Sequence, residues 1–306
     1  MDGLITHETP DVKLPTMIVA FAGWPDAAEA ATRAIRYMVR KLPAKKIAEI
    51  DPEEFFDFTV VRPQTRVNRR GERIIRWPRN DFYYYPPDET QSGILLYVGT
   101  EPNLKWRAFS NIVCEMALKY EVKLVVSLGA LLDAVPHTRE PRITGRASSK
   151  DLTEKVKWLG IQNSGYQGPT GIHTAFMDAC DKNGLAHASI WGHCPHYVNT
   201  SPNPRVSHAL LTKLRNLVDF NVDLQELKLS GEAFDEEVAK AIAKQDDVTS
   251  YVTRLEQRYD KAHQPEDAMG TGVLRPHVDH ELEGVGLISF FQLGCASYLN
   301  WINPEP

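Results

Sequence analysis

The first two hundred residues alternate between short apolar runs and longer amphipathic segments. In the longer segments, residues 26–42, 106–120 and 171–183, apolar residues recur three and four positions apart, as on a helix with one buried face. The short runs are rich in β-branched residues, as buried strands are. These runs are residues 16–23, 45–51, 94–99, 123–129 and 186–192. Strands that alternate with helices predict an α/β fold, with a mostly parallel sheet sandwiched by helices.

Residues 55–85 interrupt this rhythm. Apolar and polar residues alternate there in FDFTVVRPQTRV, RIIRWP and DFYYY, and the polar stretch NRRGE separates the first two. A period of two on both sides of a polar turn predicts a β-hairpin insertion that projects from the sheet. Because such an insertion would expose Phe, Trp and Tyr side chains, we expect it to form a contact between subunits.

Beyond the fifth strand the pattern becomes helical. Apolar residues form two stripes at helical spacing, one over residues 206–217 and one over residues 234–259. We therefore divide the chain into an α/β core over residues 1–204, a helical lid over residues 205–264 and a tail over residues 265–306.

The tail contains an uncharged stretch, residues 284–304, that is long enough to cross a bilayer. It includes three glycines and several polar residues, and it is flanked by Glu283 and Glu305 rather than by basic residues. These features disfavour a membrane anchor and favour a packed or disordered tail.

Composition narrows the class of protein. Apolar residues make up 42% of the 306 residues and charged residues 25%, which are ordinary values for a globular chain. The net charge of −5 gives no general attraction to nucleic acid or anionic lipid. The four cysteines form no CxxC pair and the polar N-terminus carries no signal peptide, which predicts a cytoplasmic protein. Arginines that flank the predicted hairpin turn are interpreted as a solvated or intersubunit face: Arg66, Arg69, Arg70, Arg73, Arg76 and Arg79.

Unusual loops follow the predicted strands or precede the predicted helices. In a parallel sheet, ligands bind outside the carboxyl ends of the strands, so we expect these loops to meet at one edge and form a pocket. The candidate ligand-binding residues in these loops are Gly23, Trp24, Asp26, Glu101, Asn103, His137, Thr138, Arg139, Gly168, Thr170, Gly171 and His196.

Several of these residues also have a structural interpretation. Asp26 precedes a predicted helix, where it would serve as an N-cap. Glu101 is either a solvated loop carboxylate or an acid–base group at a strand end. Residues 168–171 suit an anion bound at a helix N-terminus, but they have neither dinucleotide-binding nor P-loop spacing. His137 and Arg139 either hold a phosphate or carboxylate or belong to a loop locked by two prolines.

The sequence contains few of the motifs that indicate metal binding or nucleophilic catalysis. His193, Cys194 and His196 are residue types that bind zinc, but no second pair of ligands stands at the spacing of a structural site. No metal and no cofactor is therefore predicted. Gly-x-Ser-x-Gly and the known cysteine-nucleophile signatures are absent. If the protein is an enzyme, Glu101 and His137 are the candidate catalytic residues.

Around these loops the sequence resembles the PAC2 family, named for proteasome assembly chaperone 2, and most of all its actinobacterial branch. The stretches that carry the resemblance follow the family's order and span most of residues 16–265. They are IVAFAGWPDAAEAA (18–31), IAEIDPEEFFDFTVVRP (47–63), EPNLKWRAF (101–109), VVSLGALLDAVPHTR (125–139), ITGRAS (143–148), YQGPTGI (166–172) and PHYV (195–198).

The resemblance implies an α/β core like that of purine nucleoside phosphorylases and some peptidases. It also implies that the hairpin mediates trimer formation and that the C-terminal helices lie over a ligand site. Relatives in eukaryotes and archaea assist or bind proteasome components. The family pattern has small or apolar residues where His193 and Cys194 stand, which argues against an inherited metal site, and it does not extend over the tail from about residue 272.

Two hypotheses of different class follow. The first is a non-catalytic, assembly-chaperone-like homotrimer whose pocket binds a ligand, a peptide terminus or a partner protein, with no role for nucleic acid or a membrane. The second is a hydrolase or nucleoside-phosphorylase-like enzyme that uses the same pocket. The absence of a nucleophile–base signature favours the first.

Overall fold

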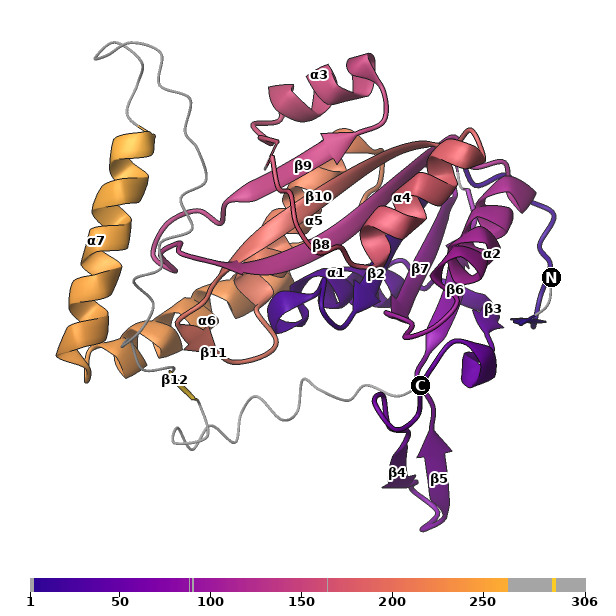
Figure 1. Cartoon of the computed structure of the whole chain (residues 1–306), viewed down its shortest axis with the longest axis horizontal. Coiled ribbons are helices and arrows are strands. Elements are labelled where there is room, and N and C mark those ends of the chain that lie inside the picture. Colours follow the sequence, from indigo (N-terminus) through magenta and orange to yellow (C-terminus); the bar gives the residue numbers. More distant parts are fainter. Residues whose placement is uncertain (1–2, 88, 90, 164, 264–287, 290–306) are drawn as a thin grey trace.

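The computed structural model describes residues 3–87, 89, 91–163, 165–263 and 288–289. Its centre is an eight-stranded sheet with helices on both faces (Figure 1), which confirms the predicted α/β fold. In spatial order the strands are β1 (Leu4–Thr6), β3 (Lys45–Ile50), β6 (Asn80–Tyr85), β7 (Ile94–Thr100), β2 (Thr16–Ala22), β8 (Leu124–Asp133), β10 (Ala186–Pro195) and β9 (Ile143–Ala147).

The four strands β7, β2, β8 and β10 form a parallel centre, and β1, β6 and β9 pair antiparallel with their neighbours. Every residue of β2 from Met17 to Phe21 is fully buried, because helices cover both faces of the strand. A continuous apolar run is therefore needed at this place, rather than an alternating one. Ile18 stands beside Leu96 on one side and Val126 on the other, so the core continues across the strands.

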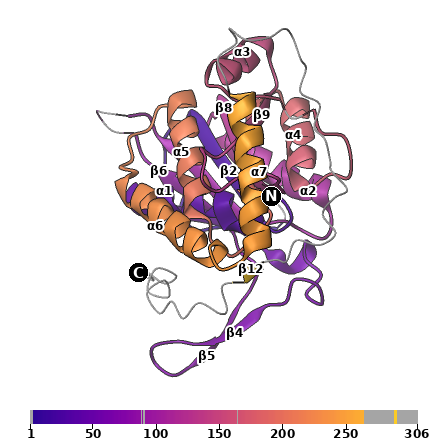
Figure 2. The same ribbon diagram turned by 90° about the vertical axis from the view of Figure 1, so that its left-hand side faces the viewer.

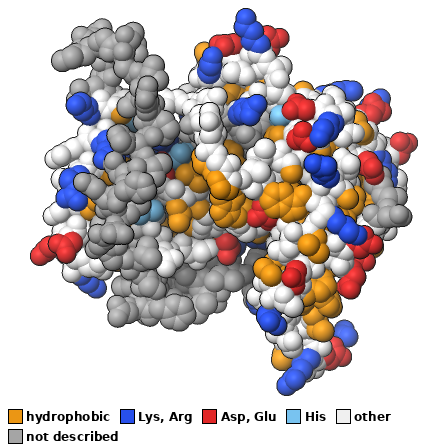
Figure 3. All heavy atoms as spheres, in the orientation of Figure 1, with side chains coloured by type: hydrophobic (Ala, Val, Ile, Leu, Met, Phe, Trp, Pro, Cys, Tyr) orange, Lys and Arg blue, Asp and Glu red, His pale blue; other side chains and the backbone are white. Residues whose placement is uncertain are grey.

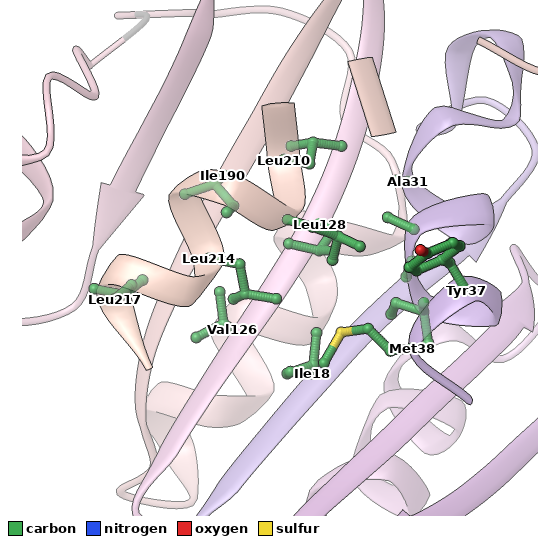
Figure 4. Packing of buried hydrophobic residues seen from close by; sticks show 14 of the residues in the cluster. Ile18, Ala31, Tyr37, Met38, Val126, Leu128, Ile190, Leu210, Leu214 and Leu217 are labelled. Atoms are coloured by element: carbon green, nitrogen blue, oxygen red, sulfur yellow. The ribbon is translucent and has the colours of Figure 1, made fainter. Parts of the chain in front are cut away.

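One face of the sheet is covered by α1 (Ala30–Lys41) and α5 (Pro204–Leu217), with α3 (Lys150–Trp158) near the β9 edge. Figure 4 shows Met38 of α1 and Leu214 of α5 packed against Ile18 and Val126 of the sheet. Helix α5 is thus integral to the core, and only the helices that follow it extend beyond the sheet.

The opposite face is covered by α2 (Trp106–Lys119) and α4 (Ile172–Lys182). Phe21 of β2 lies between them, with its ring centroid 6.3 Å from that of Phe109 in α2 and 5.9 Å from that of Phe176 in α4. The sheet is consequently sandwiched by helices, and the carboxyl ends of the four parallel strands are left free for other segments.

Strands β4 (Gln64–Val67) and β5 (Arg73–Arg76) form a two-stranded sheet of their own that projects from the body of the molecule (Figures 1 and 2). Asn68 shapes the turn, because its Oδ1 accepts hydrogen bonds from the amides of Arg70 and Glu72 at 2.9 and 3.0 Å. The hairpin spans fewer residues than the predicted 55–85 segment. Residues 80–85 form β6 of the main sheet, because their apolar side chains are buried there between β3 and β7.

Helix α6 (Gln225–Ile242) packs along α5, and Glu226 in its first turn pairs with Arg40 and Lys41 of α1. Helix α7 (Asp246–Ala262) follows it, and Figure 2 shows α7 in front of the carboxyl ends of β8 and β10. The two helices have a small apolar cluster of their own, in which Phe234 and Val238 of α6 and Val252 and Leu255 of α7 pack against Tyr197. The remaining elements are the 3₁₀ turns η1 (Ala27–Glu29) and η2 (Pro52–Glu54) and the paired short strands β11 (Val198–Asn199) and β12 (Ile288–Ser289).

The predicted tail, residues 265–306, lies outside the described residues apart from β12. The uncharged stretch 284–304 belongs to this tail, and only its residues 288–289 are described. Within the described part of the chain, no helix has the length and apolar character needed to cross a membrane.

Candidate functional site

A first group of candidate residues gathers where β2 and β7 end and α4 begins. Glu101 Oε1 accepts a hydrogen bond of 2.8 Å from the amide of Ile172, the first residue of α4. Trp24 lies against Gly171, where an added Cβ would stand 2.9 Å from Trp24 Cε3 and 3.0 Å from Glu101 Oε1. Gly23 has φ +115° and an added Cβ there would meet Glu101 Cβ at 3.4 Å, so glycine is required at this close turn. The structure thus brings Gly23, Trp24, Glu101 and Gly171 together.

At the start of α4, a carboxylate of the protein itself occupies the position where an external anion could bind. The Glu101 carboxylate occupies the N-terminus of α4, where both a free amide and the helix dipole favour negative charge. Gly168 and Thr170 adjoin the group and are exposed. An external phosphate or carboxylate at this place would have to displace Glu101. Trp24, with 64% of its surface exposed, is left as the accessible member.

Asp26 is directed elsewhere, into the first turn of α1. Its Oδ1 accepts from the amides of Ala31 and Thr32 at 2.8 and 3.2 Å, and its Oδ2 accepts from the Thr32 hydroxyl. Burial raises the pKa of Asp26 to about 6, although these hydrogen bonds oppose the rise. The sequence is compatible with two roles for Asp26, a helix cap or a ligand contact. Its observed hydrogen bonds are those of a helix cap.

A second group joins the loop after β8 to α7. Arg139 makes a bidentate pair with Asp260, with Nε–Oδ1 and Nη2–Oδ2 distances of 2.8 Å each, and its Nη1 lies 3.2 Å from Glu256 Oε1. The Thr138 hydroxyl donates to the same Glu256 oxygen. The Arg139 guanidinium therefore holds α7 against the core. The hydrogen bond to Asp260 raises the pKa of Arg139 further above its usual value.

His137 and His196 lie behind this contact and share Tyr197. The hydroxyl of Tyr197 accepts from the His137 amide at 2.8 Å and lies 2.9 Å from His137 Nδ1. His196 stacks edge-on against Tyr197 and against Tyr251 of α7. Burial lowers the pKa of His137 to about 4, so its ring is neutral at pH 7.

Asn103 belongs to neither group. Its side-chain oxygen accepts from the amide of Asp57 at 3.1 Å, and its own amide donates to the carbonyl of Phe55 at 3.0 Å. It fixes the segment that leads into the hairpin. The twelve candidate residues are thus divided among the start of α4, the start of α1, the α7 contact and the root of the hairpin.

Sequence reasoning missed a relay of hydrogen bonds that crosses three strands. His193 Nδ1 lies 2.7 Å from Asp133 Oδ2, and His193 Nε2 lies 2.9 Å from Thr144 Oγ1. Burial would raise the pKa of Asp133, but the hydrogen bond from His193 and other contacts hold it below its usual value. The ionised Asp133 carboxylate accepts a hydrogen bond from Nδ1–H of the neutral His193 ring, so Nε2 accepts from the Thr144 hydroxyl. This order of groups is that of acyl-transfer enzymes, but Thr144 is only 1% exposed.

The side chains that could bind a metal ion are held in other contacts. The described residues contain no group of three or more His, Cys, Asp or Glu side chains arranged to hold a metal ion. The potential ligands have other partners: His193 belongs to the relay, and the thiol of Cys194 donates to the carbonyl of Ala27 at 3.5 Å.

Several solved structures are similar to this chain. A PAC2 family protein of Streptomyces avermitilis is 35% identical, with a TM-score of 0.71 over 78% of this chain and 99% of that chain. A proteasome-assembly chaperone homologue of Mycobacterium tuberculosis is 34% identical, with a TM-score of 0.70 over the same shares. An archaeal proteasome activator of Pyrococcus furiosus shares the fold, at 17% identity and a TM-score of 0.63 over 78% of this chain and 97% of that chain.

No curated protein matches the sequence. The PAC2 family matches residues 20–242, which run from the end of β2 to the end of α6. They include the other strands of the central sheet except β1, the hairpin, and all twelve candidate ligand-binding residues. More than half of the chain is covered, and the resemblance noted in the sequence is confirmed. The chain belongs to the PAC2 family.

Proposed function

We propose that the protein is a non-catalytic binding protein of the proteasome-assembly-chaperone type, and that it works as a homotrimer joined through the β4–β5 hairpin. The observation that carries the proposal is the apolar face of the hairpin. Thr65 pairs with Ile75 and Val67 pairs with Arg73, so Val67 and Ile75 point to the same side, together with Trp77 two residues further on. Val67, Ile75 and Trp77 are 65%, 58% and 45% exposed.

An exposed apolar face on an isolated hairpin needs a partner. Two-stranded sheets are marginally stable in water, and contiguous exposed apolar side chains mark sites of association. Figure 3 shows hydrophobic and basic side chains together on the projecting hairpin. A second copy of the chain satisfies this surface, and a contact that joins unlike surfaces closes into a ring when the rotation permits. The homotrimer implied by the family resemblance is such a ring.

The proposed partner is a proteasome component. What supports this is the printed description of two relatives, the chaperone homologue of Mycobacterium tuberculosis and the activator of Pyrococcus furiosus. The accessible indole of Trp24, beside Glu101 and Gly171, is the proposed contact for a partner's peptide segment. No role for nucleic acid is proposed, because the net charge is −5.

Catalysis is not part of the proposal because the candidate acid–base groups are used within the fold. Glu101 caps α4, and His137 is neutral and buried against Tyr197. A general acid or base must reach a substrate atom, and neither group is free to do so in this arrangement. The proposed location is the cytoplasm, and what supports it is that the four cysteines stand far apart in the sequence with no CxxC pair.

The partner is tested by binding to the proteasome core particle of the same organism. We expect saturable binding of the full-length protein to the purified particle in biolayer interferometry, and weaker binding of the Trp24→Ala variant. Lys150→Ala, at an exposed position on the distant helix α3, is the control and should bind like wild type. Absence of binding to the particle and to its isolated subunits would overturn the proposed partner.

A hydrolase or phosphorylase-like activity is the second candidate, and one observation favours it. The Asp133–His193–Thr144 relay has the hydroxyl, base and carboxylate of an acyl-transfer site, but Thr144 is buried. Wild type should give no turnover with peptides, amides, esters or nucleosides with phosphate. A turnover that His193→Gln or Glu101→Gln removes, with the fold retained, would establish the enzyme and contradict the non-catalytic proposal.

A further inference from the structure

The outer side of α6 carries an exposed apolar stripe bordered by carboxylates. Leu229 is 53% exposed, and Ala233, one turn further along the helix, is exposed as well. Glu232 and Glu236 stand three and seven positions after Leu229 and therefore share its side of the helix. Both are exposed, and Glu232 Oε1 lies 3.8 Å from Lys228 Nζ, at the outer limit of an ion pair. Leu229, Glu232, Ala233 and Glu236 make up the α6 face.

The other side of α6 is anchored in the core. Leu227 is fully buried in the cluster that α1 and α5 form with the sheet, and Phe234 and Val238 are buried against Tyr197. Helix α6 is therefore held in place from within the chain. The α6 face is a surface that exists before any partner binds, so a partner does not have to order it.

The β4–β5 hairpin has the complementary character. Its apolar face combines Val67, Ile75 and Trp77 with Arg73, which pairs with Val67 and lies on the same side. Residues 62–76 contain six arginines and one glutamate, a net charge of +5, whereas the whole chain has a net charge of −5. The rest of the chain therefore carries −10. Apolar side chains among arginines fit apolar side chains among carboxylates in both burial and charge.

Charge distinguishes the α6 face from other exposed apolar positions. Trp158 of α3 is 86% exposed, but its helix carries three lysines and two acidic residues, so arginines would meet no net negative charge there. On α6, the exposed Leu229 stands between turns that carry Glu232 and Glu236. Complementary charge selects the partner surface and speeds the encounter, and apolar burial then holds the contact.

We propose that the α6 face is the surface that receives the hairpin of a neighbouring copy. This inference rests on the proposed homotrimer and adds the surface to which the hairpin binds. Figure 1 shows the hairpin and α6 apart in one chain, so the contact joins two copies. Each copy gives its hairpin to one neighbour and receives a hairpin from the other, which closes the ring. Leu229 packs against Val67 and Ile75, and the carboxylates of the α6 face lie opposite Arg73.

Paired cysteines test this contact without removing its large apolar side chains. Thr65 pairs with Ile75 on the apolar face of the hairpin, and Thr65 and Ala233 are both exposed. In the full-length Thr65→Cys/Ala233→Cys variant, a short bismaleimide should link neighbouring copies into covalent dimers and trimers on a denaturing gel. Each single variant should stay unlinked, and so should Thr65→Cys combined with Lys157→Cys, an exposed position on α3.

Light scattering on wild type and on the same double variant separates two kinds of failure. A trimer in which Thr65→Cys and Ala233→Cys stay unlinked would overturn the α6 face as the receiving surface and leave the hairpin-mediated trimer standing. A monomeric wild type would contradict the trimer itself, and this inference with it.

Charge reversal gives a second measurement. Glu232→Arg with Glu236→Arg should raise the dissociation constant of the assembly by about tenfold or more, because like charges then face each other. Arg73→Glu in the same chain should recover part of this loss. Glu154→Arg, at an exposed position on α3, is the control and should assemble like wild type. Unchanged association of the Glu232→Arg/Glu236→Arg variant, with its fold verified by circular dichroism, would contradict the proposed contact.

Discussion

The β4–β5 hairpin and the carboxyl edge of the sheet differ in how their side chains are satisfied within the chain. At the carboxyl edge, charged groups meet partners at short range: Asp26 bonds to α1, Glu101 to α4 and Arg139 to α7. On the hairpin, Val67 and Ile75 stand largely in solvent, on two strands that pair only with each other among the described residues. In the first region these charged groups are paired within one chain, and in the second the apolar side chains are exposed.

This difference shows that residue type alone does not identify a functional site at a sheet edge. A carboxylate or an arginine at a strand end suggests chemistry, but here these groups close helix ends and hold a helix in place. An apolar residue in the hairpin sequence does not by itself indicate a function. Its exposure in the folded monomer does, because clustered exposed apolar side chains mark sites of association. We therefore expect substitutions at the carboxyl edge to change stability and substitutions on the hairpin to change association.

The largest effect on stability is expected at Asp26 and depends on pH. Burial raises the pKa of Asp26 from 3.8 to about 6. Between roughly pH 4 and 6, Asp26 binds a proton in the folded state but not in the unfolded state. Its protonation therefore stabilises the folded state at low pH, and this contribution is lost as the pH rises through about 6. The unfolding free energy of wild type minus that of Asp26→Asn should therefore rise by up to about 3 kcal/mol from pH 7 to about pH 4.

Urea unfolding of both proteins at the two pH values measures this difference. Taking the difference removes the contribution of Asp235, whose pKa burial also raises to about 6. A difference that does not change with pH would mean that Asp26 is not buried as the α1 cap, and the carboxyl edge would then be open to ligands.

A smaller effect is expected at the start of α4. Glu101→Ala leaves the Ile172 amide without its acceptor and should lower the unfolding free energy by about 1 kcal/mol, the usual value of a helix cap. Glu101→Gln keeps an acceptor oxygen and should stay within about 0.5 kcal/mol of wild type. Urea unfolding of the pair measures both changes. Equal losses in the two variants would show that the carboxylate charge, not the hydrogen bond, stabilises this end of the helix.

The most local effect is expected at the α7 contact. Arg139→Ala removes the pairs with Asp260 and Glu256, so amides in α7 should exchange with deuterium faster while those in α1 and α5 keep their protection. Arg142→Ala is the matched control, because Arg142 pairs with Asp133 and not with α7. Added salt should speed exchange in wild-type α7 for the same reason. Unchanged exchange in the Arg139→Ala variant would show that the apolar cluster alone holds α7.

Much of the fold could be predicted from the hydrophobic pattern, and the errors have physical reasons. The five short apolar runs all form strands, and a strand that is buried on both faces, such as β2, needs a continuous run. β1, β9 and α3 were not predicted, since three short elements at or near the edges of the sheet carry little periodic signal. β6 was assigned to the hairpin because its alternation fits an antiparallel strand equally well in either sheet.

The candidate site could be predicted less well, because its contacts join distant residues. The capping role of Asp26 is local, and the sequence raised it. Glu101 bonds to an amide 71 residues away and Arg139 to a carboxylate 121 residues away, which no local pattern reveals. The relay from Asp133 through His193 to Thr144 depends on the register of three strands. Candidate residues could be named from the sequence, but their partners could not.

The central claim is that the chain associates through the apolar face of its hairpin, and a matched pair of substitutions tests it most directly. Ile75 on the hairpin and Leu132 at the carboxyl edge are both 58% exposed, so a carboxylate at either position is solvated to a similar degree. Light scattering at micromolar concentration gives the mass of wild type, Ile75→Asp and Leu132→Asp. We predict three times the monomer mass for wild type and Leu132→Asp, and a folded monomer for Ile75→Asp. A monomeric wild type, or an Ile75→Asp variant that keeps the wild-type mass, would contradict the claim.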